Sequence, residues 1–288
     1  MKQYVRYVKP GFREFDPVSL ARETERIVCK GENRKYTGFV ADPEYQTIVT
    51  GYASGCCLRC VFCSADWSRD YPRKCGHFYS PKEAFEKLSR TAKKFGFKRL
   101  RISGAEPTIG REHLLELLEL VEKSRFRVFV LETNGILFGS DKDYVKEISR
   151  FRKIHIRVSL KAGTPDDFAR KTGAIPESFN IPFQAIENLT KFEVRFNVAA
   201  VTDPRLMSRW ERNALLKKLS DISPKTLLSL EDEVIFPYAT AIARLRSAGF
   251  NWHHFLLPLK LIGVIKRHNR AFRHIHYAFE RSKNRISD

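Results

Sequence analysis

The segment GCCLRCVFC, residues 55–63, contains four of the six cysteines in the chain. Cys56, Cys60 and Cys63 have the spacing Cys-x3-Cys-x2-Cys, and Cys57 adds a fourth thiol. A disulfide, zinc, an iron-sulfur cluster and plain core packing all compete as explanations. Structural zinc takes four protein ligands, often as two Cys-x-x-Cys pairs, and no second pair occurs elsewhere in the chain. Three thiolates suit a [4Fe-4S] cluster whose fourth iron is open to another ligand.

The composition is that of an ordinary globular protein. The 288 residues are 43% hydrophobic and 30% charged, which suits one large α/β domain or two small ones. No apolar run approaches the ~20 residues of a membrane span, and the N-terminal sequence lacks a secretory signal. We therefore expect a cytoplasmic protein with no membrane association. Thiols stay reduced in that compartment, which favours metal binding over disulfides for the clustered cysteines.

The chain is strongly basic, with 52 Lys and Arg against 33 Asp and Glu and a formal net charge of +19. Such an excess favours polyanionic partners, and nucleic acid is the first candidate. An ordinary solvated surface explains the same charge equally well. The sequence from Pro258 onward is basic and aromatic, which fits either a contact with a phosphate backbone or a terminal helix that packs its rings.

A repeating unit of strand, loop, cap and helix begins near residue 80. Ser80 to Glu83 is a capping box with proline at the first helical position. Similar helix starts occur at residues 140–143, 164–165 and 208–211. Six strands are predicted, at residues 46–53, 99–103, 127–132, 154–161, 194–201 and 226–230. Strands that alternate with helices predict right-handed βαβ units and a parallel sheet, either open or curled into a partial barrel.

Alternating polarity within the strands favours the curled sheet. Residues 154–161 alternate between apolar and polar side chains, as do 99–103 and 194–198. If helices cover the apolar face, the polar face lines the concave side of an incomplete barrel that holds a polar, anionic group. The alternative is that these strands are shorter and their polar residues lie in loops. The basic side chains of this face are Arg101, Arg157 and Arg195. They form either an anion site or ion pairs with the carboxylates of Glu106, Glu132 and Glu231.

Three segments resemble motifs of the radical S-adenosylmethionine (radical SAM) superfamily. The cysteine spacing, with Phe62 before the last cysteine, is similar to its CxxxCxxC signature. Residues 103–107, Ser-Gly-Ala-Glu-Pro, resemble the GGEP motif that follows the second strand. Residues 132–135, Glu-Thr-Asn-Gly, resemble the DTNG segment of glycyl-radical activating enzymes such as the pyruvate formate-lyase activating enzyme. The resemblance covers about residues 46–235 and implies an α/β fold, a partial (βα)6 TIM-like barrel with N- and C-terminal extensions.

The resemblance also implies a site. Cys56, Cys60 and Cys63 would ligate a [4Fe-4S] cluster whose open iron binds S-adenosylmethionine. Reductive cleavage would then give a 5′-deoxyadenosyl radical that abstracts hydrogen from a substrate. Gly104 and Glu106 are expected at the methionine moiety, although Glu106 also fits a plain charge at a helix N-terminus. The residues expected to contact the cofactor are Phe62, Gly104, Ala105, Glu106, Glu132, Asn134, Ser159, Lys161 and Asn197, with the last three at the ribose and carboxylate. The other cysteines are expected to be packed or idle thiols; they are Cys29, Cys57 and Cys75.

Three parts of the chain are expected: an N-terminal extension (1–45), a radical SAM core (46–235) and a basic C-terminal helical extension (236–288). The resemblance implies an electron donor such as ferredoxin or flavodoxin. Three functions remain open. The first is a radical enzyme acting on RNA, above all tRNA. The second is an activase-like radical enzyme acting on a protein or a small anionic metabolite, and the third is a non-catalytic zinc or redox module that binds nucleic acid.

Overall fold

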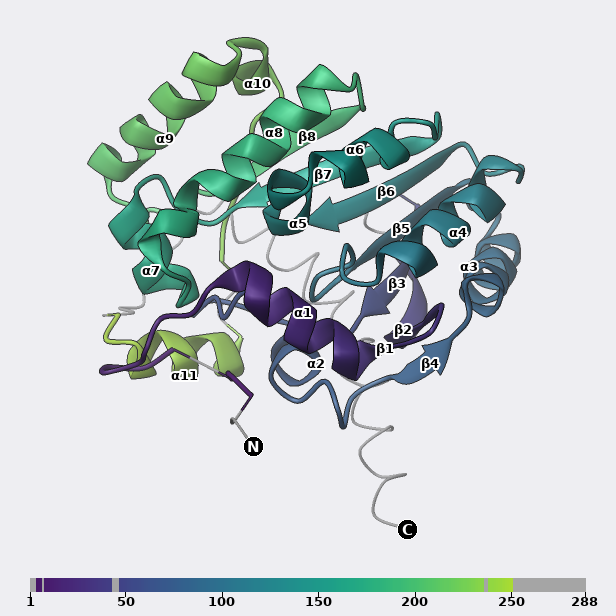
Figure 1. Cartoon of the computed structure of the whole chain (residues 1–288), viewed down its shortest axis with the longest axis horizontal. Helices are drawn as coiled ribbons and strands as arrows, with labels where there is room; N and C mark the ends of the chain where they lie inside the picture. The colour runs from purple at the N-terminus through teal and green to yellow at the C-terminus, as the bar shows by residue number, and fades with distance from the viewer. Residues whose placement is uncertain (1–3, 7, 43–46, 236–237, 251–288) are drawn as a thin grey trace.

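The computed structural model describes residues 4–6, 8–42, 47–235 and 238–250 (Figure 1). Its centre is one mixed sheet in the order β1-β2-β3-β5-β6-β7-β8-β9, with β4 paired to β2. The strands are β1 (Cys29–Lys30), β2 (Asn33–Asp42), β3 (Ile48–Ala53), β4 (His77–Tyr79), β5 (Arg99–Gly104), β6 (Val128–Thr133), β7 (Ile154–Leu160), β8 (Phe196–Val201) and β9 (Glu231–Glu233). β3, β5, β6, β7, β8 and β9 are parallel neighbours, whereas β1, β2 and β4 pair antiparallel.

Helices begin where side-chain caps were predicted. Ser80 accepts from the backbone N–H of Glu83, whose carboxylate accepts in return from Ser80, so the predicted capping box is confirmed. Asp141, Thr164 and Ser208 cap three later helices in the same region of the sequence as expected. The helices are α1 (Pro17–Val28), α2 (Asp66–Asp70), α3 (Pro81–Phe95), α4 (Arg111–Glu122), α5 (Ile136–Ser140), α6 (Lys142–Ile148), α7 (Pro165–Thr172), the 3-10 helix η1 (Pro176–Asn180), α8 (Ile181–Lys191), α9 (Arg209–Ile222), α10 (Lys225–Leu228) and α11 (Ala239–Ser247).

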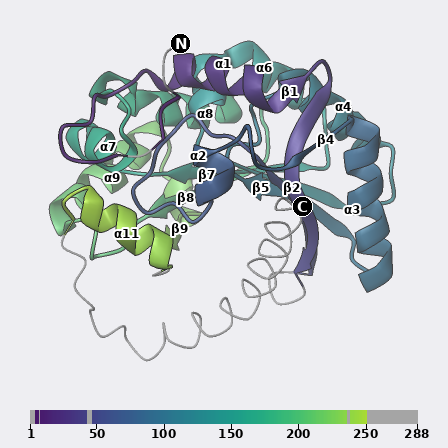
Figure 2. The same ribbon diagram turned by 90° about the horizontal axis from the view of Figure 1, so that it is seen from below.

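The two faces of the sheet differ as the alternating pattern predicts. Ile154, Ile156 and Val158 of β7 are buried, whereas His155 and Arg157 between them are half-buried. Figure 2 shows α4, α6 and α8 together on one side of the sheet. The opposite, polar face carries the charged side chains of β5, β6 and β7. The predicted α/β class with a partial barrel is confirmed, and the described strands do not close into a full barrel.

The prediction of a sixth strand at residues 226–230 is wrong. These residues form the short helix α10 and the turn after it, and the strand follows as β9. Thr226 donates its hydroxyl hydrogen to the carbonyl oxygens of Leu219 and Ser223, and its backbone N–H also bonds to Ser223, which fixes a helical turn. Leu228 is 89% exposed, so the apolar run that suggested a buried strand does not face the core.

The segment before residue 46 is joined to the sheet. Strand β2 pairs along its length with β3, which sequence reasoning did not foresee. Arg34 of β2 is buried and donates to the carbonyl oxygens of Ile109 (2.7 Å) and Glu106 (3.2 Å), behind the end of β5. At the other end, helix α11 is described, whereas residues 251–288 of the predicted basic extension lie outside the described residues. Within the described part, no helix has both the length and the apolar character needed to cross a membrane.

Candidate cluster and substrate site

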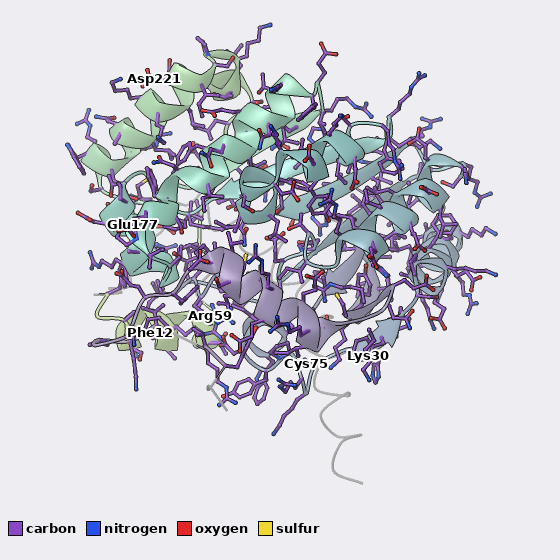
Figure 3. All side chains as sticks on the ribbon, in the orientation of Figure 1. Phe12, Lys30, Arg59, Cys75, Glu177 and Asp221 are labelled. Atoms are coloured by element: carbon purple, nitrogen blue, oxygen red, sulfur yellow. The ribbon has the colours of Figure 1, made fainter. Side chains whose placement is uncertain are left out.

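The cysteine segment forms the loop at the carboxyl end of β3, and backbone hydrogen bonds hold it on two sides. Gly55 donates to the carbonyl of Ser68 (2.7 Å) and accepts from the N–H of Glu106 (2.9 Å). Arg59, labelled in Figure 3, donates its backbone N–H to the carbonyl of Thr172 at the end of α7 (2.9 Å). The loop is therefore docked between the turn after β5 and the end of α7.

Most of this loop is buried, and N–H donors lie near the sulfur of Cys56. Cys56 and Cys60 are 8% and 7% exposed, Cys63 is half-buried, and all six cysteines of the chain are free thiols. The backbone N–H of Leu58 lies 3.4 Å from Cys56 Sγ, and the side-chain amide of Asn134 lies 3.7 Å from the same sulfur. Such donors stabilise a thiolate or a metal-bound sulfur.

The pKa values separate the two adjacent cysteines. A hydrogen bond from the Cys57 thiol lowers the pKa of Cys56, whereas burial raises the pKa of Cys57 well above its usual value. Burial also raises the pKa of Cys60 to about 12, against the opposing effect of Lys161 and Arg69. Of the neighbouring pair, Cys56 is thus the better ligand, because metals bind the thiolate.

The donor set fits a [4Fe-4S] cluster. Among the residues that the structure describes, no three His, Cys, Asp or Glu side chains converge as ligands of a single metal ion. A cubane does not need such convergence, because each cysteine binds a different iron. A cluster held by three thiolates carries negative charge, and Lys161 and Arg69 supply positive charge close to Cys60.

Gly104 and Ala105 lie beside this loop, where β5 ends. Gly104 has a φ of +102°, and a Cβ there would lie 2.9 Å from the carbonyl oxygen of Ala53, so only glycine fits without strain. The N–H of Ala105 donates to the same Ala53 carbonyl (3.1 Å). Phe62 of the cysteine loop is buried in the core. The predicted motif after β5 is thus next to the cysteine loop.

Glu106 is buried, at 1% exposure, and its carboxylate binds the chain itself. Oε1 accepts from the N–H and hydroxyl of Thr108 (3.1 and 2.6 Å) and from the hydroxyl of Thr133 (2.7 Å). Oε2 accepts from the backbone N–H of Asn134 (2.9 Å). This geometry favours a positioning role for the carboxylate over the direct contact with a cofactor that the sequence suggested. Through Asn134, it fixes an amide that reaches the Cys56 and Cys57 sulfurs.

Glu132, the other acidic residue of the predicted site, lies on the concave face. Its carboxylate accepts from Arg101 (3.3 Å) and from the hydroxyl of Ser103. Arg101 also donates to Thr50 of β3 (2.8 Å). Of the two readings of the basic face, ion pairing therefore holds for Arg101 and Glu132.

Ser159 and Lys161 meet at the carboxyl end of β7, together with a residue that sequence reasoning missed. Lys161 donates to the Ser159 hydroxyl, and Ser159 donates to Glu233 of β9 (2.7 Å). Burial raises the pKa of Glu233, but Lys161 and Arg157 lower it by more, to about 2. The only sequence signal for Glu233 was the run of acidic residues at 231–233. Its partners depend on β9 pairing with β8.

Asn197 of β8 is paired with Arg157, two residues before Ser159 on β7, and its Oδ1 is 2.9 Å from His155 Nε2. Both side chains line a cavity of about 290 Å³ near the amino ends of the strands. Arg157 donates to Glu231 (2.8 and 2.9 Å) at the rim of this cavity. The full lining is Ile48, Arg99, Arg101, Val130, Glu132, His155, Arg157, Asn197 and Glu231. Of the predicted cofactor residues, Glu132 and Asn197 therefore line this cavity, whereas Ser159 and Lys161 are not part of its lining.

Comparisons with known proteins identify a family and relatives of this chain. A family model described as the Radical SAM superfamily matches residues 52–204. A curated protein of Methanocaldococcus jannaschii, named probable GTP 3′,8-cyclase, is 27% identical over 156 residues, which cover 53% of this chain and 50% of that protein. A protein of the same name from Thermococcus kodakarensis is 27% identical over 138 residues, 48% of this chain and 41% of that protein. The chain thus spans about half the length of these relatives, or less.

A solved structure shares the fold. Streptococcus suis SuiB bound to S-adenosylmethionine is 16% identical with a TM-score of 0.51, over 77% of this chain and 46% of that chain. At this identity the similarity concerns the fold alone.

Proposed function

The chain belongs to the radical SAM superfamily, and we propose that it is a radical enzyme acting on a small anionic substrate, a purine nucleoside triphosphate, in the concave cavity. Membership implies a [4Fe-4S] cluster, S-adenosylmethionine and a reductant. In this proposal Cys56, Cys60 and Cys63 ligate the cluster, and the backbone around Gly104 receives the methionine moiety. When bound, these groups supply one-electron cleavage of S-adenosylmethionine and hence radical chemistry.

The residues of the chain have three tasks in this proposal. The buried loop keeps water from the sulfur atoms of Cys56 and Cys60, because these two residues are almost fully covered. Glu106 holds Asn134, whose amide donates to Cys56 Sγ. Ser159 and Lys161, backed by Glu233, present a hydroxyl and an ammonium group at the carboxyl end of β7, close to the cysteine loop.

The observation that carries the substrate class is the cationic cavity. Arg99 and Arg101 of β5 and Arg157 of β7 line it, together with His155. Glu132 and Glu231 neutralise two of these arginines, whereas Arg99 makes no ion pair among the described residues. A cavity of about 290 Å³ suits part of a small ligand, and an arginine without a carboxylate partner suits a phosphate.

The names of the relatives make GTP the first nucleotide to test, because the two curated relatives are named as enzymes acting on GTP. The RNA alternative rests on the net charge of +19 and on the basic, aromatic sequence from Pro258 onward. A charge spread over a whole chain does not define a site, whereas the cavity places three arginines, a histidine and two glutamates around one volume, and Arg99 has no ion pair there with any residue that the structure describes.

The test is anaerobic reconstitution with iron and sulfide, followed by dithionite, S-adenosylmethionine and one candidate substrate at a time. We expect 5′-deoxyadenosine formation to rise with GTP and a modified purine to appear in equal amount. Bulk tRNA and ATP are the competing substrates. Stimulation by tRNA but not by GTP refutes the substrate assignment, and no cleavage of S-adenosylmethionine by cluster-loaded protein refutes the proposed site.

A pair of variants tests the cavity directly. Arg99→Met removes the arginine without an ion pair, and we expect the KM for GTP to rise at least tenfold, roughly the value of one charged hydrogen bond. Arg127→Met is the matched control, because Arg127 is exposed just before β6 and does not line the cavity. Equal KM values in the two variants contradict the proposed location.

A further inference from the structure

Two arginines from distant parts of the chain hold the backbone of the cysteine loop. Arg69 of α2 donates through Nη1 to the carbonyl oxygen of Cys60 (2.7 Å). Arg244 of α11 donates through Nη1 to the carbonyl oxygen of Cys63 (2.6 Å). Each proposed ligand at the end of the loop therefore has a guanidinium group on its own carbonyl.

Asp70 joins the two arginines. Its Oδ1 and Oδ2 accept from Nε and Nη2 of Arg69 (2.8 and 2.9 Å), and Oδ2 also accepts from Nη2 of Arg244 (3.0 Å). The side chains of Arg69 and Asp70 are 1% and 5% exposed, and that of Arg244 is 14% exposed. We call these three residues the Arg69-Asp70-Arg244 bridge. Two guanidinium groups and one carboxylate are thereby held next to the cysteine loop in a poorly solvated place.

Helix α11 lies beside α7, and this packing places Arg244 next to the cysteine loop. Figures 1 and 2 both show α11 beside α7, and the guanidinium carbon of Arg170 in α7 lies 4.2 Å from the ring centre of Phe250, just after α11. Leu245, next to Arg244, is fully buried. The position of Arg244 is therefore fixed by the fold and not by a mobile surface side chain.

We propose that the Arg69-Asp70-Arg244 bridge positions the cluster loop and raises the reduction potential of its cluster, which makes α11 part of the cluster environment. The inference rests on the ligation by Cys56, Cys60 and Cys63 in the proposed function. Reduction adds one electron, supplied by dithionite in the test, to a cluster that already carries negative charge. The guanidinium groups of Arg69 and Arg244 contact the loop carbonyls directly, and positive charge placed there at low dielectric favours the reduced form. Arg244 acts as a positioning residue, through the Cys63 carbonyl and Asp70.

The test is a potentiometric titration of the reconstituted cluster without substrate, followed by electron paramagnetic resonance. For Arg244→Met we expect the ratio of reduced to oxidised cluster, at the wild-type midpoint, to fall at least tenfold, which is ~59 mV for one electron. Arg246→Met is the control, because it removes the same charge from an exposed position of the same helix. Arg244→Lys keeps the charge, so its midpoint should lie closer to wild type than that of Arg244→Met.

Asp70→Asn distinguishes an electrostatic effect of the bridge on the cluster from simple structural support of the loop. It removes a negative charge, so the field predicts a shift to higher potential, opposite to that of Arg244→Met. Shifts of the two variants in the same direction overturn the proposal, as do identical midpoints for Arg244→Met and Arg246→Met. If Arg244→Met holds no cluster, Asp70→Asn decides alone, and a midpoint at or below wild type overturns the proposal. A wild-type protein that binds no cluster refutes the ligand assignment instead, before any variant is made.

Discussion

Replacement of Glu106 by glutamine tests whether this carboxylate organises the site or touches the cofactor. In the best orientation, the glutamine oxygen keeps the three bonds that Oε1 accepts from Thr108 and Thr133. Its NH2 group then faces the backbone N–H of Asn134, which in the unmodified protein donates to Oε2 of Glu106. Two buried donors are then without acceptors, namely the Asn134 N–H and the new NH2 group. At roughly 2 kcal/mol for each, Glu106→Gln should lower the free energy of unfolding by about 4 kcal/mol.

The assay is urea denaturation of the cluster-free protein, followed by circular dichroism in the absence of S-adenosylmethionine. Glu112→Gln on the exposed side of α4 is the matched control and should change the stability by less than about 0.5 kcal/mol. If Glu106→Gln is as stable as this control but binds S-adenosylmethionine more weakly, the carboxylate contacts the cofactor directly. That result would refute the positioning role.

Three further outcomes are expected. Cys60→Ala should abolish the visible absorption of the reconstituted cluster and the cleavage of S-adenosylmethionine, whereas Cys57→Ala should keep both; a colourless Cys57→Ala protein would mean that the ligands were assigned wrongly. Burial lowers the pKa of His113 from 6.5 to about 4, so between these pH values only the unfolded chain binds this proton. The free energy of unfolding should therefore fall by about 3 kcal/mol from pH 6.5 to 4. His113→Gln should remove this dependence of the unfolding free energy on pH. Gly104→Ala should destabilise the protein by about 3 kcal/mol, because residue 104 has a positive φ and a Cβ there would contact β3. Gly38→Ala, which has open space around it, should cost under about 1 kcal/mol. Equal urea midpoints for the two variants would contradict this account.

Local patterns in the sequence were sufficient for most of the fold. Helix caps such as Ser80 and Ser208 act within four residues, so their effect is visible without tertiary information. The alternation along residues 154–160 showed which side chains face the helices, because successive residues of a strand point to opposite faces. The prediction of a strand at residues 226–230 failed because it relied on the hydrophobicity of this segment alone. There Thr226 bonds to the end of α9, a contact that hydrophobicity does not encode.

The sequence by itself determined the cysteine spacing, the glycine at 104 and the polar concave face, because each depends on residue type at short separation. Only the tertiary structure decided which charges meet. Glu233 reaches Ser159 through strand pairing across 74 residues, and Arg244 reaches Asp70 across 174 residues. Likewise, the carboxylate of Glu106 is buried and accepts from Thr133 and Asn134, partners that the sequence did not indicate. The physical reason is that a charged side chain takes its role from its nearest partners, and those partners are set by the packing of distant segments.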